Sequence, residues 1–200
     1  MRILITDTHF GVKQNSINWL NSQLDFIYKQ LIPYIKSQKG YKQLIHLGDV
    51  FDSRSTISTY VATKVIEAIR DLRSCVDDFI IIGGNHDFFL WHIGPQTNHT
   101  GSEVMKKLLR SKKGNSKLVY LQDSSFEFEG KRFYGTPWIE DLQNWAFYLP
   151  PEELEKKWST IPRKFDVFIS HMPPRRSGLG QVIQPGHNYG NDYGSQLLAE

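Results

Sequence analysis

The chain has 200 residues, 40% of them hydrophobic and 22% charged, which suits one packed domain and excludes extensive disorder. Its single cysteine, Cys75, excludes an intrachain disulfide and a thiolate metal cluster. The formal net charge of +3 permits an anionic partner but is too small to indicate one.

The N-terminal half predicts alternating strands and helices. Short apolar runs at residues 2–6, 43–47 and 79–82 are typical of buried strands. Between them, apolar residues recur every three or four positions over 19–35 and 59–73, which indicates amphipathic helices. This order favours right-handed crossovers and a mainly parallel sheet flanked by helices, which is an α/β fold.

The C-terminal half predicts a less regular mixture of elements. Glu129-Gly130 indicates a β-hairpin, and the Gly-, Pro- and Asn-rich segment 172–194 indicates a long loop with a functional or mobile role. No shift in composition divides the chain, so we expect a single domain over residues 1–200. Strands are expected at 117–123, 126–130, 131–138 and 165–170, and helices over 103–110, from residue 150 and from residue 195.

The sequence shows no membrane or secretion signal. Residues 1–7, "MRILITD", pass directly into the first expected strand, and no apolar stretch is long enough to span a bilayer. We therefore expect a soluble, cytoplasmic protein with no membrane partner.

Polar side chains follow four of the expected strands. Ligands of an open α/β sheet bind beyond the carboxyl ends of its strands, so these side chains are expected to meet at one edge. One such residue is commonly a helix cap or a turn former, but four coincidences favour a functional site. In chain order they are Asp7, His9, Asp49, Asn85, His86, Asp87 and His171.

The types of these side chains predict a metal centre. Carboxylate, imidazole and amide groups are ligands of Mn, Fe, Zn or Mg, and we expect two divalent ions, with manganese first. Asp49 can bridge them, because a carboxylate has two oxygens. Two such ions convert a shared water into hydroxide and clamp phosphoryl oxygens. We expect His86 to protonate or stabilise the leaving oxygen without binding metal, and Asp87 to orient it.

The motifs Asp7-x-His9, Gly48-Asp49-x-x-Asp52 and Gly84-Asn85-His86-Asp87, with the later His171, resemble the ordered motifs of the calcineurin-like metallophosphoesterases. The resemblance covers nearly the whole chain and implies a β-sandwich flanked by helices. It also implies that His86 is the catalytic histidine. The ligands that it implies are Asp7, His9 and Asp49 for one metal, and Asp49, Asn85 and His171 for the other.

One departure from the family pattern lies near the C-terminus. The family closes with Gly-His-x-His on a further strand, whereas the only Gly-His here is Gly186-His187, followed by Asn188 and Tyr189. We therefore expect a domain that lacks its C-terminal end, with His187 as an alternative ligand. A non-catalytic, phosphate-binding remnant of the fold is the alternative to an enzyme.

Two substrate classes compete. The stretches "DTHFGVKQNS" and "HLGDVFDSRSTIS" resemble SbcCD-type DNA exonucleases, which act with a coiled-coil ATPase partner. On that interpretation Arg54, Arg175 and Arg176 contact DNA phosphates. The stretch "FISHMPPRRSGLG" instead resembles small phosphoesterases that hydrolyse mononucleotides or other small phosphate esters, where the last two arginines would hold a substrate phosphate. The longer N-terminal match favours the nuclease.

Overall fold

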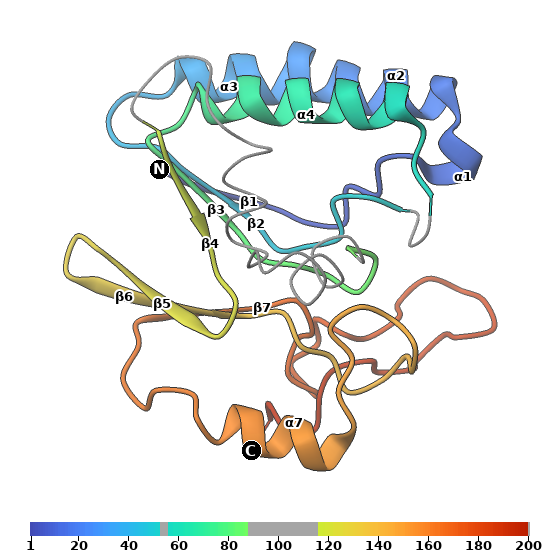
Figure 1. Ribbon diagram of the computed structural model, residues 1–200, viewed down its shortest axis with the longest axis vertical. Helices are drawn as coiled ribbons and strands as arrows, with labels where there is room; N and C mark the ends of the chain where they lie inside the picture. Colours follow the sequence, from blue (N-terminus) through green and yellow to red (C-terminus); the bar gives the residue numbers. More distant parts are fainter. Residues whose placement is uncertain (53–55, 88–115, 200) are drawn as a thin grey trace.

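Two β-sheets pack face to face between two layers of helices (Figure 1). The computed structural model describes residues 1–52, 56–87 and 116–199. Helices of the N-terminal half cover the outer face of one sheet, and a C-terminal helix lies beyond the other. The expected α/β fold, a β-sandwich flanked by helices, is confirmed. Within the described residues, no helix has the length and apolar character needed to cross a bilayer.

The first sheet is parallel and contains the three strands expected in the N-terminal half. Leu44 and Phe79 belong to the core on the helix side, whereas Ile45 and Ile80 belong to the core between the sheets. Burial on both faces explains why these runs are continuously apolar. Across the sheet the strands are β1 (Arg2–Ile5), β2 (Gln43–His46), β3 (Asp78–Ile81) and β4 (Lys117–Tyr120).

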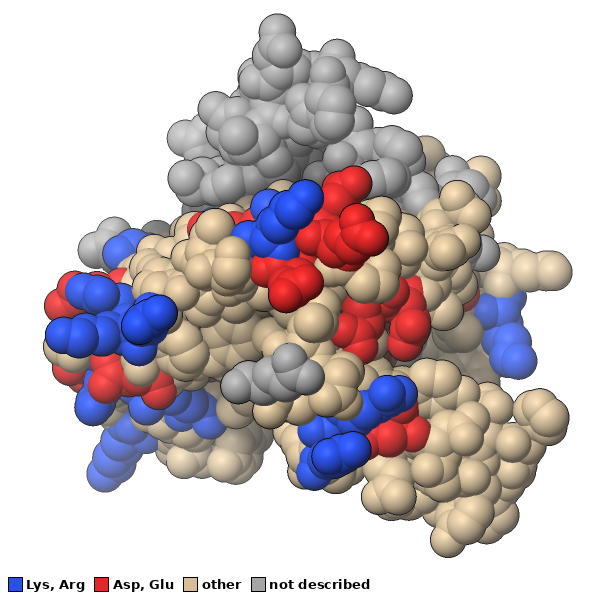
Figure 2. All heavy atoms as spheres, turned by 90° about the horizontal axis from the view of Figure 1, so that it is seen from below, with Lys and Arg blue, Asp and Glu red and all other residues tan. Residues whose placement is uncertain are grey.

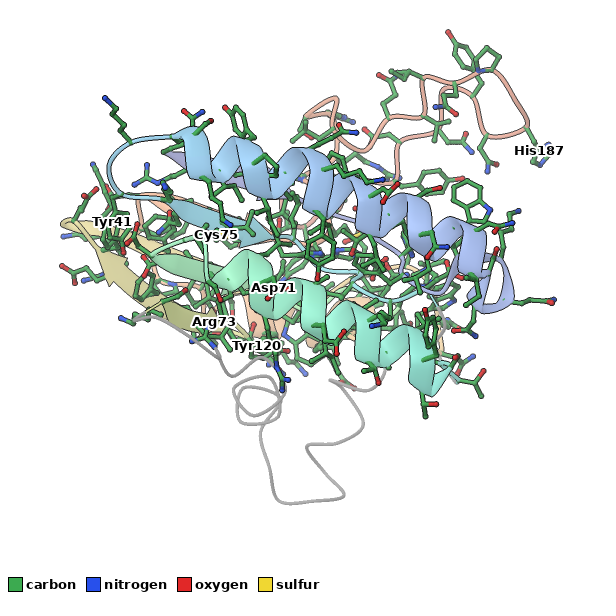
Figure 3. All side chains as sticks on the ribbon, turned by 90° about the horizontal axis from the view of Figure 1, so that it is seen from above. Tyr41, Asp71, Arg73, Cys75, Tyr120 and His187 are labelled. Atoms are coloured by element: carbon green, nitrogen blue, oxygen red, sulfur yellow. The ribbon has the colours of Figure 1, made fainter. Side chains whose placement is uncertain are left out.

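The two expected helices of the N-terminal half lie side by side over this sheet (Figure 3). The one expected over 59–73 is α4 (Thr59–Arg73), where Ser58 accepts a hydrogen bond from the Val61 N–H and caps the first turn. The one expected over 19–35 is a rod of three consecutive segments with a π-helical middle. After the single turn α1 (Val12–Asn15), these segments are α2 (Ile17–Phe26), η1 (Ile27–Leu31) and α3 (Ile32–Ser37).

The second sheet has the order β5-β6-β7. The hairpin expected at Glu129-Gly130 is confirmed, because β5 and β6 pair antiparallel across it, and β7 pairs parallel to β6. Phe133 and Ile169 of this sheet pack against Ile45 and Ile80 of the first. The elements of this half are β5 (Ser124–Phe128), β6 (Lys131–Thr136), α7 (Pro151–Trp158) and β7 (Val167–Ser170).

The helix expected from residue 195 is wrong. Ser195 forms a bridge with Pro174, and its Oγ donates a hydrogen bond to Glu140 at 2.8 Å. The other carboxylate oxygen of Glu140 accepts the N–H of Gln196 at 2.9 Å, so long-range contacts hold this segment in turns. The segment 172–194 is a long loop, as expected. The helix expected over 103–110 lies outside the described residues.

Candidate metal centre

Two loops that follow β1 and β2 are joined by backbone hydrogen bonds. The N–H of Asp7 donates to the Gly48 carbonyl at 3.2 Å, and the N–H of His9 donates to the Asp49 carbonyl at 3.0 Å. Asp7, His9 and Asp49 have φ of 48°, 43° and 55°, which non-glycine residues seldom adopt. Such conformations persist where surrounding contacts enforce them, and they gather at functional sites.

Asp49 lies at the centre of the arrangement and is only 2% exposed. Its Oδ2 lies 3.7 Å from His9 Nε2, 3.6 Å from His171 Nε2 and 4.0 Å from His86 Nε2. Its Oδ1 accepts the backbone N–H of His86 at 2.8 Å. Imidazoles from three separate chain segments therefore converge on one carboxylate.

Asp7 and His9 form one side of the centre, with Asp7 Oδ1 lying 3.5 Å from His9 Nε2. The partial burial of Asp7 acts to raise its pKa, but hydrogen bonds from His9 and Thr6 and the charge of His171 lower it to about 2. The hydrogen bond to Asp7 raises the pKa of His9 against the effect of burial, and the charge of Asp49 adds to the rise. Asp7 is therefore held as a carboxylate, whose negative charge a cation would offset.

Asn85 and His171 meet at the other side of Asp49. His171 Nε2 lies 2.8 Å from Asn85 Oδ1, and His171 Nδ1 lies 2.9 Å from the Leu47 carbonyl. Both partners are oxygen acceptors, so when Nδ1 donates its proton to Leu47, the Nε2 lone pair and Asn85 Oδ1 face each other as two electron-pair donors, which a cation would accommodate. Metal-binding histidines use this arrangement, in which a carbonyl fixes the tautomer.

His86 faces the centre from between these two sides. Its Nδ1 lies 2.5 Å from the carbonyl oxygen of Asp52, and its ring packs edge-to-face on His9 and Trp145 at 4.5 and 4.7 Å between centroids. The expectation that Asp87 orients His86 is therefore corrected, because the Asp52 carbonyl occupies that position. Because the acceptor is a backbone carbonyl, no residue type in the sequence indicates it.

Asp87 instead holds the backbone of the site together. It is fully buried, and its carboxylate accepts the N–H groups of Gly84 and Asp49 at 2.9 Å each and of Val50 at 3.1 Å. Burial, followed by the charge of Asp49, raises the pKa of Asp87 to about 7, although the backbone N–H groups act to lower it. Asp87 thereby fixes the loop that carries Asp49 against the end of β3.

Two glycines provide the space that this packing needs. Gly48 has φ of 101°, and a Cβ there would lie 2.8 Å from the Gly83 carbonyl oxygen. A Cβ on Gly84 would lie 2.2 Å from Asp49 Oδ1. Any side chain at Gly84 would therefore displace the central carboxylate.

The carboxylate oxygens and imidazole nitrogens around Asp49 lie 3.5–4.0 Å apart, a spacing that suits ligands of a shared ion. Oxygen and nitrogen ligands lie about 2.0–2.2 Å from such an ion, which places two ligands of one ion about 3–4 Å apart. Asp7, His9 and Asp49 offer ligand atoms within 4.8 Å of one another. A second such group joins His9, Asp52 and His86. Oxygen and imidazole donors of this kind fit divalent ions.

The remaining expected site residues do not reach this cluster through any described contact. Arg175 and Arg176 are exposed, and Arg175 Nη2 donates to the Asp192 carbonyl of its own loop at 3.1 Å. His187 is exposed and points outward from the far end of that loop (Figure 3). Arg54 lies outside the described residues.

Sequence reasoning missed three residues beside the centre. His46 is buried, and its Nδ1 accepts the Gly48 N–H at 3.2 Å while Nε2 lies 3.1 Å from Thr8 Oγ1. Asp52 contributes its carbonyl to His86 and a carboxylate oxygen 3.5 Å from His9 Nδ1. Trp145 packs on His86 from a distant loop. The sequence could have indicated Asp52, because this residue follows Gly48-Asp49 at the spacing of the motif. No pattern in the sequence indicates Trp145.

Several known proteins are similar to parts of this chain. UPF0046 protein T07D4.2 of Caenorhabditis elegans is 32% identical over 127 residues, which cover 56% of this chain and 32% of that protein. Metallophosphoesterase domain-containing protein 1 of Homo sapiens is 33% identical over 111 residues, or 48% of this chain and 32% of that protein. UPF0046 protein C25E10.12 of Caenorhabditis elegans is 30% identical over 157 residues, which cover 74% of this chain and 50% of that protein. The chain thus spans half or less of the length of these relatives.

A solved structure, that of the protein of unknown function AQ665 from Aquifex aeolicus, has a TM-score of 0.34 and 20% identity, over 80% of this chain and 69% of that one. This likeness is too weak to inform the fold. The model of the family described as "Calcineurin-like phosphoesterase", by contrast, matches residues 1–199. The chain therefore belongs to the calcineurin-like phosphoesterase family.

Proposed function

We propose that this chain hydrolyses phosphodiester bonds at the centre around Asp49 with the help of two divalent ions, manganese first among them. The convergence of three imidazoles on that one buried carboxylate is the observation that best supports the proposal. Asp7, His9 and Asp49 would hold one ion. Asn85 and His171 would share Asp49 to hold the other. Bound ions would lower the pKa of a water molecule and offset the charge of the phosphate.

The protein's own groups then position the reaction. Asp49 lies between the two halves of the ligand set, and Asp87 holds its loop through backbone N–H groups. The Asp52 carbonyl accepts the Nδ1 proton of His86, which directs Nε2 toward the centre. From there Nε2 can donate a proton to the leaving oxygen.

Two substitutions test these assignments. We expect Asp49→Asn to lose most bound Mn²⁺, and His86→Gln to retain it while hydrolysis of bis(p-nitrophenyl) phosphate falls roughly 100-fold or more. Asp25→Asn is the matched control, because Asp25 is exposed and pairs only with Lys29 among the described contacts. Metal content by elemental analysis and initial rates give the readouts.

The possible results separate three interpretations. Equal loss of metal and rate in His86→Gln would make His86 a ligand, as its grouping with His9 and Asp52 allows. A wild-type chain that binds no metal would contradict the proposal and indicate a remnant of the fold. Retained metal with lost activity would support the assignment of His86.

The substrate is a finer proposal. The stretches at residues 7–16 and 46–58 support DNA, and in that case a coiled-coil ATPase partner follows by the same resemblance. One observation favours small phosphodiesters. On the face shown in Figure 2, Lys and Arg lie in separate groups beside Asp and Glu, and the described part of this face has no broad basic surface. Extended DNA contacts need such a surface.

A substrate panel decides between the two classes. Linear duplex DNA, single-stranded DNA, cyclic nucleotides and aryl phosphates should be compared with Mn²⁺ present at several salt concentrations. Small phosphodiesters as the fastest substrates, with DNA inert, would contradict the nuclease. DNA cleavage that is lost on Arg175→Ala and Arg176→Ala would support the nuclease and the expected role of these arginines.

A further inference from the structure

A loop of the C-terminal half lies against His86, the expected catalytic histidine. This loop, residues 137–150, connects β6 to α7 and presents Trp145 to the site. The rings of Trp145 and His86 have centroids 4.7 Å apart and an interplanar angle of 72°. That is the edge-to-face geometry that aromatic pairs prefer, so the contact is a favourable one.

Two contacts fix this loop to the segment that follows β3. The N–H of Ala146 donates to the Asn85 carbonyl at 3.2 Å. Phe147 is fully buried, and a Cβ on Gly83 would lie 2.4 Å from its ring, so the glycine provides the space in which the loop packs. The two residues that follow Trp145 are therefore held directly against the chain segment that carries His86.

The backbone around Trp145 also has an uncommon conformation. Leu142, Asn144 and Phe147 have φ of 68°, 68° and 57°, in the left-handed region that non-glycine residues seldom adopt. Hydrogen bonds hold this path, since the Trp145 N–H donates to the Leu142 carbonyl at 3.1 Å and the Ile139 N–H to the Phe147 carbonyl at 2.9 Å. Such conformations persist where the surrounding structure enforces them, and they gather at functional sites.

The His86 ring needs a contact of this kind to keep one orientation. The hydrogen bond between its Nδ1 and the Asp52 carbonyl fixes one ring atom but leaves the ring able to tilt about that atom. The rings of His9 and Trp145, at 84° and 72° to the imidazole, oppose such a tilt. His9 is an expected metal ligand, so its own position depends on the ion, whereas Trp145 is held by protein contacts.

We propose that Trp145 is a positioning residue, which sets the tilt of the His86 ring and so keeps Nε2 directed at the leaving oxygen of the substrate. The inference rests on the proposed function, in which His86 is the proton donor. Trp145 acts through His86 and makes no contact with the reacting atoms. An edge-to-face aromatic pair corresponds to a factor of roughly 2 to 10 in an equilibrium or a rate, which sets the size of the expected effect.

Steady-state kinetics with bis(p-nitrophenyl) phosphate and saturating Mn²⁺ measure the effect. Trp145→Ala should lower kcat roughly 3- to 10-fold while KM and the bound metal stay at their wild-type values. Trp145→Phe keeps an aromatic ring and should retain most of kcat. Trp19→Ala is the matched control, because it makes the same change on α2, where Trp19 is 52% exposed, and should leave kcat unchanged.

A double-mutant cycle shows whether the effect passes through His86. In a His86→Gln background, Trp145→Ala should lower kcat by less than about twofold, because the ring that it positions is already absent. A loss equal to that in the wild-type background would overturn the proposal, and so would a Trp145→Ala variant with wild-type kcat. A rise in KM alone would indicate contact with the substrate and would overturn it as well.

The same cycle separates failure of this inference from failure of the proposed function. A His86→Gln variant with the wild-type rate would contradict the proposed function and the inference together. A low rate in His86→Gln, with an equal loss from Trp145→Ala in both backgrounds, would overturn the inference alone. Circular dichroism establishes that each variant is folded. If Trp145→Ala does not fold, Trp145→Leu, which keeps apolar volume without the ring, takes its place in the cycle.

Discussion

His46 shows how one buried side chain supports the metal centre without belonging to it. It is only 2% exposed, and its two ring nitrogens join the Gly48 N–H to the Thr8 hydroxyl. It therefore connects the loop that carries Asp7 and His9 to the loop that carries Asp49. Both hydrogen bonds need a neutral ring, with Nδ1 as acceptor and Nε2 as donor.

This neutral state predicts a pH dependence of stability. Burial, assisted by the charge of His171 and opposed by that of Asp7, lowers the pKa of His46 to about 4. The unfolded chain titrates near 6.5, so stability is fully present above that pH and is lost as pH falls toward 4. At pH 5 the loss from this one residue is about 2 kcal/mol.

Urea denaturation with a chelator present, at pH 7 and pH 5, measures the effect. His46→Gln lacks the titrating ring, so its unfolding free energy should fall less over that interval than that of the wild-type chain. The chelator keeps the protein free of metal, so competition between protons and metal ions does not add to the pH dependence of the unfolding free energy. An identical fall in both proteins would show that His46 does not titrate in this way.

Individual site residues were predictable where a strand end determined their position. Asp7, Asp49, Asn85 and His171 follow strands whose apolar runs are visible in the sequence, and all four lie at the same edge. The role expected for Asp87 was wrong for a physical reason. Its partners are backbone N–H groups, and backbone groups have no residue identity that a motif could reveal.

Among the elements, β7 does most to complete the site from a distance in the chain. It belongs to the second sheet, yet His171, which directly follows it, reaches Asn85 and the Leu47 carbonyl beyond the first. Ile169 of β7 is 4% exposed and packs in the core between the sheets. We expect that packing to set how far His171 extends toward Asp49.

Ile169→Ala should therefore have two effects. We expect the free energy of unfolding to fall by about 2–5 kcal/mol, because the change leaves a cavity in a close-packed core. Metal titration should also show weaker binding at the site shared by Asp49, Asn85 and His171. Ile183→Ala, on an exposed side chain, should change stability by no more than about 0.5 kcal/mol. Unchanged metal affinity in a destabilised Ile169→Ala would refute the positioning role of β7.

Elements with local determinants were the predictable ones. The helix α4 coincides with its expected range because apolar spacing and the Ser58 cap both act within the segment. The π-helical η1 has the same apolar periodicity as an α-helix over so short a span, so the sequence predicted one helix there. The helix expected from residue 195 was wrong because Glu140, 55 residues away, and a bridge to Pro174 hold Ser195 in another conformation.

For the whole molecule, the arrangement of two sheets was expected from the family resemblance rather than from periodicity. Local patterns do not show that β6 pairs parallel with β7 across a long connection containing α7. The consequence is that the expected ligands come from both sheets. Asp7, Asp49 and Asn85 follow strands of one sheet, and His171 follows a strand of the other.

A metal held between both sheets should stabilise the entire chain. A ligand that binds only the folded state at a concentration about 100 times its Kd adds about 2.7 kcal/mol per site. For a chain of this size each kcal/mol raises Tm by about 2–4 °C, so saturating Mn²⁺ should raise the Tm of the metal-free protein by roughly 5–10 °C or more. Asp49→Asn should abolish the rise, and Asp25→Asn should preserve it. A wild-type Tm that Mn²⁺ does not move, measured by differential scanning calorimetry, would contradict a metal centre that joins the two sheets.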